Sequence, residues 1–216
     1  MKKIIFIAAL IAFISAFPAE KTIFRITQYD DADTMSQTMT LVSDSNRSVI
    51  IQSSGRMIFD YEKDTLFLID DSLKTAMKMS VSMLGLFVAG LTEAAEMKAD
   101  SLTVKIQKSE KKYEYEGNFY PQFSVYSNEE KILTVAVDEN ADYSMTLKSI
   151  DKLEKMIEQI VGFDLQNAGI KSINGLPKVI IYFKENTKKT KIVLTDYAKG
   201  AFAKYFEIPS DYKKGY

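Results

Sequence analysis

The 216-residue sequence contains no histidine, no cysteine and no tryptophan. Without histidine it has neither a Ser-His-Asp triad nor an imidazole metal ligand. Without cysteine it has no thiolate nucleophile, zinc-thiolate site, iron–sulfur cluster or disulfide. These absences remove most familiar catalytic and cofactor chemistry, so we expect no enzyme activity, no cofactor and no metal site.

The chain also lacks an excess of charge of either sign, with 28 Lys+Arg against 29 Asp+Glu and a net charge of −1. A nucleic-acid partner requires a concentrated basic face, which this balance disfavours. The composition, 46% hydrophobic and 26% charged, is typical of a globular protein. The length is enough for one domain with a substantial core.

The first sixteen residues have the pattern of a secretory signal peptide. Met1–Lys3 is a short basic segment, and Ile4–Ile14 is an unbroken apolar run. The run is too short to span a bilayer, which takes about 20 helical residues. We expect cleavage after Ala16, with Ala19 as the alternative, and a single domain over 17–216 that is exported to the periplasm or beyond. Because no cysteine follows the apolar run, we do not expect a lipid-anchored lipoprotein.

Most of the remaining chain predicts short β-strands, because apolar and polar residues alternate with a period of two between turn residues. Closely connected strands pair antiparallel, and so many strands in one sheet should make it curl. We therefore predict a mainly β (α+β) fold, a curved antiparallel half-barrel of about 10–12 strands. The strands are expected near 22–29, 35–43, 47–53, 56–61, 65–70, 74–79, 102–108, 112–118, 122–127, 131–137, 178–184 and 189–196.

Two segments break the alternating pattern and predict helices. Residues 81–95 begin with a run that is apolar on every side and uncharged up to Leu91, which predicts a buried helix. Residues 143–165 carry apolar side chains at spacings of three and four, which predicts a surface helix with one core-facing stripe. Both helices are expected to cover the concave side or the mouth of the sheet.

The first predicted helix and the strands near it suggest a hydrophobic ligand site, because methionine adapts to irregular apolar ligands. The helix is either a lid that contacts a ligand or a permanent part of the core, and the sequence leaves both interpretations open. The expected lining residues are Met77, Met79, Met83, Leu84, Phe87, Leu91, Tyr113 and Tyr115. For the two tyrosines we favour the simpler interpretation, packing in the core or the cavity wall.

Two polar features suggest further sites, each with a simpler interpretation. Arg47, one of three arginines, could bind a lipid headgroup at the cavity mouth. The simpler interpretation, which we favour, is a solvated charge on an edge strand. An enzyme using Asp60, Asp70 and Asp71 as acid and base would need two carboxylates that face each other across a cleft.

Two parts of the sequence resemble the DUF4412 family of exported bacterial proteins. Residues 174–179, Asn-Gly-Leu-Pro-Lys-Val, and 206–214, Phe-Glu-Ile-Pro-Ser-Asp-Tyr-Lys-Lys, are similar to the end of that family. Residues 46–51, 58–60 and 65–70 are similar to its opening strands. The family is similar in architecture to LolA/LolB and LppX-type carriers, which hold acyl chains against a curved sheet.

The resemblance implies a non-enzymatic, soluble periplasmic carrier or binding protein for a lipid or another hydrophobic ligand. The alternative is an envelope protein–protein interaction module with a filled core and no ligand. A cavity would favour the carrier, whereas a closed core with an exposed apolar patch would favour the interaction module.

Overall fold

A computed structural model describes residues 19–29, 34–80, 104–127, 129–161, 173–184 and 186–215. The predicted signal peptide and the predicted helix at 81–95 lie outside these ranges. Of the predicted site residues, Met83, Leu84, Phe87 and Leu91 lie outside them as well.

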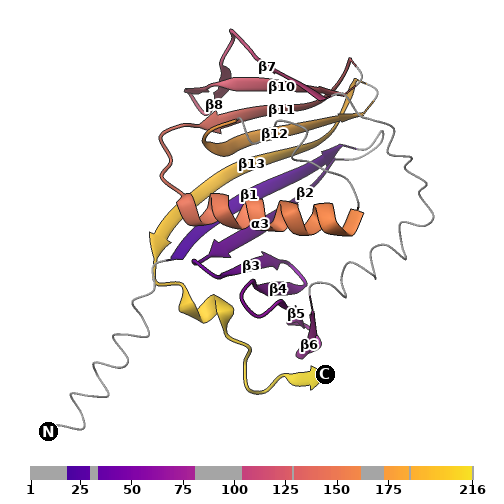
Figure 1. Ribbon diagram of the computed structural model, residues 1–216, viewed down its shortest axis with the longest axis vertical. Coiled ribbons are helices and arrows are strands. Elements are labelled where there is room, and N and C mark those ends of the chain that lie inside the picture. Colours follow the sequence, from indigo (N-terminus) through magenta and orange to yellow (C-terminus); the bar gives the residue numbers. More distant parts are fainter. Residues whose placement is uncertain are drawn as a thin grey trace, which may run out of the picture.

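The described residues form one large, open sheet of twelve strands, in the order β14-β6-β5-β4-β3-β2-β1-β13-β12-β11-β10-β7 (Figure 1). Neighbouring strands pair antiparallel, except that β14 runs parallel to β6. The N-terminal strands are β1 (Ala19–Tyr29), β2 (Thr34–Ser43), β3 (Arg47–Gln52), β4 (Gly55–Asp60), β5 (Thr65–Asp70) and β6 (Thr75–Ser80). The others are β7 (Val104–Lys108), β10 (Gln122–Ser127), β11 (Glu130–Asp138), β12 (Leu176–Lys184), β13 (Thr187–Gly200) and β14 (Lys213–Gly215).

The predicted fold class, a mainly β chain with one curved antiparallel sheet, is confirmed. One predicted strand, 112–118, is instead part of a separate hairpin of β8 (Tyr113–Tyr115) and β9 (Asn118–Tyr120). The reason is the turn between them, where Glu116 and Gly117 have φ values of 51° and 76°. Two consecutive residues with positive φ are typical of a tight hairpin turn.

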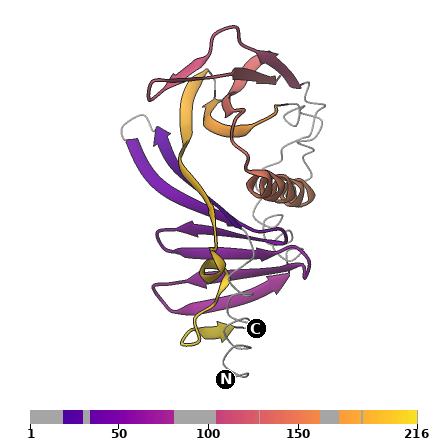
Figure 2. The same ribbon diagram turned by 90° about the vertical axis from the view of Figure 1, so that its left-hand side faces the viewer.

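The second predicted helix is present as α3 (Ser144–Val161), which crosses one face of the sheet (Figures 1 and 2). Leu147 and Ile150 of α3 pack against a cluster that contains Leu41, which confirms the core-facing stripe at these positions. Within the described residues, no helix is long and apolar enough to cross a membrane.

The opposite face of the N-terminal half of the sheet is covered by residues 202–212, and we call these residues together with β14 the tail. It includes the 3-10 helix η3 (Ala203–Phe206), and Phe206 is buried in a cluster with Val42 and Val49. Successive strand residues point to opposite faces, so Leu41 lies on the α3 face and Val42 on the tail face. The sheet is therefore the middle of three layers in this region.

A buried carboxylate holds the start of α3 against β1. Glu20 is 2% exposed, and its Oε2 accepts a hydrogen bond of 2.7 Å from the backbone N–H of Thr146. The ammonium of Lys199 lies 3.8 Å from the other carboxylate oxygen and also pairs with Asp142 at 2.9 Å. An acidic group at a helix N-terminus is favourable because it meets unpaired N–H groups and the positive end of the helix dipole.

Candidate ligand groove

An open groove of about 580 Å³ lies along β3–β6 and β14. This volume is within the range of about 300–1,000 Å³ that is common for small-molecule sites. Strand pairing explains its shape, because residues that are partners across neighbouring strands form straight rows on one face of the sheet. Three such rows cross the α3 face here, and they differ in polarity.

The middle row, which we call the apolar row, forms the floor of the groove. Its members are cross-strand partners in sequence, Ile50 with Met57, Met57 with Leu68, and Leu68 with Met77. All four side chains line the groove, and Met77 is 53% exposed. Four consecutive strands thus present an apolar surface that remains partly open to solvent.

The row on one side of the apolar row is sealed. It pairs Phe59 with Leu66 and Leu66 with Met79, and the first two are 3% and 0% exposed. The contrast within one sheet face is informative, because Phe59 and Leu66 are buried, whereas Met57 and Leu68 beside them on the same face are only partly buried. Incomplete burial of the apolar row is therefore a local property of the groove.

The row on the other side, which we call the polar row, closes one end of the groove with hydrophilic groups. It consists of the cross-strand partners Gln52, Gly55, Asp70, Thr75 and Lys213. The glycine is required, because a Cβ there would overlap the backbone carbonyl oxygen of Ile69. A ligand with an apolar part and a polar end would match both rows.

Asp70 in the polar row is occupied by its own turn. Its Oδ1 accepts hydrogen bonds from the Ser72 hydroxyl and from the backbone N–H groups of Ser72 and Leu73, the last two both at 2.9 Å. The Ser72 hydroxyl, followed by the Leu73 N–H, holds the pKa of Asp70 below its ordinary value of 3.8. The carboxylate is therefore ionised at neutral pH.

The predicted site residues separate into distinct places. Met77 lies in the groove, and Met79 packs in the sealed row beside it. Tyr113 and Tyr115 pack against a cluster that contains Val193. The next residue along β13 packs with the α3 cluster, so these tyrosines lie on the opposite face of the sheet and are not brought together with the methionines.

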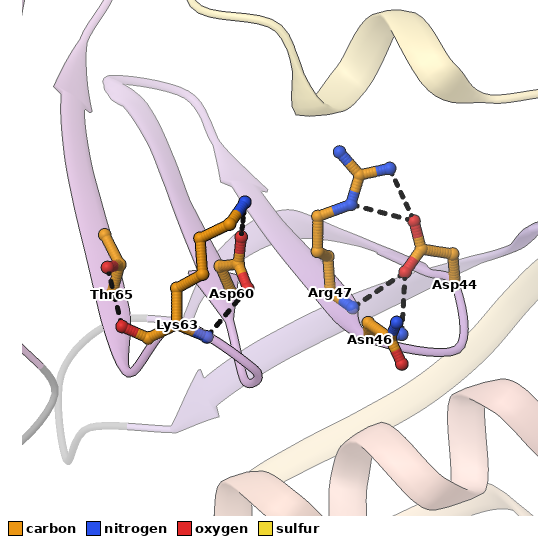
Figure 3. A network of polar contacts seen from close by, with 6 residues as sticks. All are labelled: Asp44, Asn46, Arg47, Asp60, Lys63 and Thr65. Atoms are coloured by element: carbon orange, nitrogen blue, oxygen red, sulfur yellow. Dashed lines mark hydrogen bonds and ion pairs between the residues drawn. The ribbon is translucent and has the colours of Figure 1, made fainter. Parts of the chain in front are cut away.

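Arg47 belongs to a network at the turns between strands (Figure 3). Its Nε and Nη2 donate hydrogen bonds of 3.0 and 2.7 Å to the same oxygen of Asp44. Its guanidinium also stacks over the ring of Phe206 in the tail at 4.3 Å. Arg47, which the sequence suggested as a residue that binds a headgroup, thus has two protein partners. Its contact with Phe206 attaches the tail to β3.

The same network places Asp60 beside Lys63, whose ammonium and backbone N–H donate hydrogen bonds of 3.0 and 3.1 Å to it (Figure 3). Asp60 ends β4 and Asp70 ends β5. Because these neighbouring strands run antiparallel, the two carboxylates lie at opposite ends of the strand pair. Asp71 pairs with the hydroxyl of Tyr212. These carboxylates do not face each other as an acid and base pair. In the part of the chain that the structure describes, no group of three or more acidic residues could hold a metal ion.

Sequence reasoning missed Ile50, Met57, Leu68 and Lys213 as groove residues. The first three occupy alternate positions of a predicted series of hairpins, so an explicit strand register would have aligned them with Met77. Lys213 could not be found in this way, because its parallel pairing joins residues far apart in the sequence.

No known protein family matches the sequence, and no curated protein matches it. Among solved structures, PNGF-II matches with a TM-score of 0.38 and 6% identity over 91% of this chain. This chain spans only 30% of the length of that protein. An outer membrane lipoprotein-sorting protein domain from Vibrio parahaemolyticus matches with a TM-score of 0.38 and 8% identity, over 89% of this chain and 90% of that one. A LolA superfamily protein from Nitrosomonas europaea matches with a TM-score of 0.34 and 7% identity, over 84% and 86% of the two chains. At these TM-scores the likeness does not identify an activity for this chain.

Proposed function

We propose that this protein is a non-enzymatic carrier or binding protein for a lipid or a similar hydrophobic ligand, held in the groove on the α3 face of β3–β6. The observation that carries the proposal is the apolar row, in which four paired residues face an open volume and Met77 remains 53% exposed. Export through the predicted signal peptide would place the carrier beyond the inner membrane.

The size and polarity of the groove support an acyl chain as the ligand. Each methylene that leaves water contributes about 0.8 kcal/mol. About ten buried methylenes would therefore contribute roughly 8 kcal/mol, from which the costs of association and ordering are subtracted.

The first test is native mass spectrometry of the purified protein, with titration of a fluorescent fatty-acid probe. Met77→Glu places a carboxylate on the groove floor, where it would have to lose water against an acyl chain, and we expect probe binding to fall about tenfold or more. The matched control is Met35→Glu, because Met35 is also a strongly exposed strand methionine and does not line the groove. This control should bind as the wild type does.

A second variant fills the groove without adding charge. A Cβ at Gly215, the cross-strand partner of Met77, would meet only the carbonyl oxygen of Ala76, at 4.0 Å. Gly215→Leu should therefore fold normally and reduce binding by occupying space. If both groove variants bind the probe as tightly as the wild type, the ligand does not occupy this groove. If no lipid co-purifies and the wild type binds no probe, the interaction-module alternative replaces the carrier.

A further inference from the structure

We infer that the groove selects a single-chain amphiphile with an anionic head, a long-chain fatty acid, and that Lys213 of β14 binds its carboxylate. This inference rests on the proposed function and specifies the ligand class. It follows from the distribution of charge at the end of the groove where the polar row lies.

Strand pairing positions this lysine. Lys213 pairs with Thr75, and its backbone N–H donates a hydrogen bond of 2.9 Å to the carbonyl oxygen of Lys74. Thr75 belongs to the polar row, so Lys213 extends that row across the last strand on the same face. Lys214, the next residue, pairs with Ala76 of the tail-face cluster, so its side chain points to the opposite face.

The acidic residues near this end already have partners. Asp211 pairs with the Lys74 ammonium at 3.0 Å, and Asp71 accepts a hydrogen bond of 2.7 Å from the Tyr212 hydroxyl. Asp71 also lies 3.5 Å from the Nε of Arg56. The only carboxylate of the polar row, Asp70, accepts three hydrogen bonds within its own turn.

Lys213 has no such partner. Its ammonium forms no ion pair or hydrogen bond with another residue of the described ranges, and its side chain is exposed. An unpaired cation therefore stands at the polar end of the apolar groove. A carboxylate at the end of an acyl chain complements this pattern, because its oxygens accept charge-assisted hydrogen bonds from ammonium groups.

The orientation of the ligand follows from the order of the rows. The carboxylate would lie at the polar row near Lys213, and the chain would extend over the apolar row, where Gly215 contributes no side chain beside Met77. β14 thus has two roles: it covers the edge of β6 and supplies the ammonium of Lys213 as the head-binding group. The fold brings this group to the groove from a distant part of the sequence.

The experiment compares ligands that share one chain length and differ only in the head. A long-chain fatty acid, the corresponding fatty alcohol, the corresponding alkylamine and a zwitterionic lysophospholipid are titrated by displacement of a fluorescent probe. The wild type should bind the acid most tightly. Lys213→Gln should weaken acid binding about fivefold and should leave alcohol binding unchanged. Lys204→Gln, in the same tail but outside the groove, is the matched control.

The outcomes separate this inference from the proposed function. Equal binding of acid and alcohol by the wild type, or an unchanged preference in Lys213→Gln, overturns the role of Lys213 and leaves the carrier intact. Tighter binding of the zwitterion or of the alkylamine than of the acid overturns the anionic class. Loss of binding for all four ligands overturns the proposed function itself.

Discussion

The contact between Glu20 and the start of α3 gives the sharpest prediction for stability. The Glu20 carboxylate is 2% exposed, accepts the Thr146 N–H at 2.7 Å and lies 3.8 Å from the Lys199 ammonium. Glu20→Ala would leave a buried N–H without an acceptor. Because an unsatisfied buried donor costs about 1–3 kcal/mol and this bond is charge-assisted, we expect a loss of about 2–3 kcal/mol in the free energy of unfolding.

Glu20→Gln separates the hydrogen bond from the charge. The amide oxygen of glutamine can still accept the Thr146 N–H, so only the interactions of the negative charge with the helix dipole and with Lys199 are lost. The helix dipole term is worth about 0.3–1 kcal/mol. Lys199 is 48% exposed, so solvent screens its share. Removing a buried charge also recovers some desolvation energy. We therefore expect a loss of about 1 kcal/mol, clearly smaller than for alanine.

Urea unfolding followed by far-ultraviolet circular dichroism measures both variants, with an unchanged slope as evidence that the transition remains comparable. Glu114→Gln, at an exposed position of β8, is the control and should lie within about 0.5 kcal/mol of the wild type. Equal losses for the glutamine and alanine variants would refute the separation into bond and charge. A wild-type midpoint for Glu20→Ala would refute the role of Glu20 in holding α3.

Three further predictions follow from the described contacts. Arg47→Gln removes the stacking on Phe206 and should lower the free energy of unfolding by about 1–2 kcal/mol, whereas fatty-acid binding stays unchanged; weaker binding would instead support the headgroup role. Burial raises the pKa of Asp60, but the hydrogen bonds from Lys63 outweigh this effect and hold the pKa below 3.8. The Asp60–Lys63 pair therefore stabilises the fold above that pH, and its contribution is lost as the pH falls through the folded-state pKa. The stability difference between the wild type and Asp60→Asn should therefore shrink as the pH is lowered from neutral to below 3.8 in acid unfolding measurements. Finally, Ala19 is buried in β1, so N-terminal sequencing of the exported protein should find a start before this residue, and a start after it would contradict the assigned strand end.

The strands were predictable because their information is local. Alternating polarity and short polar turns identify the strands from 22 to 79, and the apolar stripe identifies the helix that begins at Ser144. The pattern failed at the hairpin of β8 and β9, where two residues in the left-handed region reverse the chain inside one aromatic run. It also failed at β14, whose sequence Lys-Lys-Gly has no strand preference of its own.

The candidate site was only partly predictable, because it depends on neighbours across the sheet. Methionine content suggested Met77 and Met79 alike, and the structure places Met77 in the groove and Met79 in the row beside it. Tyr113 and Tyr115 have equally suitable side chains and lie on the opposite face. Composition indicates which side chains suit an apolar ligand, and the register decides which of them line the groove.

The sequence alone determined that this chain forms a curved antiparallel sheet with an amphipathic helix, because alternation and helical spacing record which side chains must leave water. Only the tertiary structure decided where an apolar surface stays open and which charges stand beside it. Cross-strand register aligned Ile50, Met57, Leu68 and Met77 into one floor, and a parallel pairing with β6 brought Lys213 to its end. Such a pairing joins segments that are far apart in the sequence, and no local pattern encodes it.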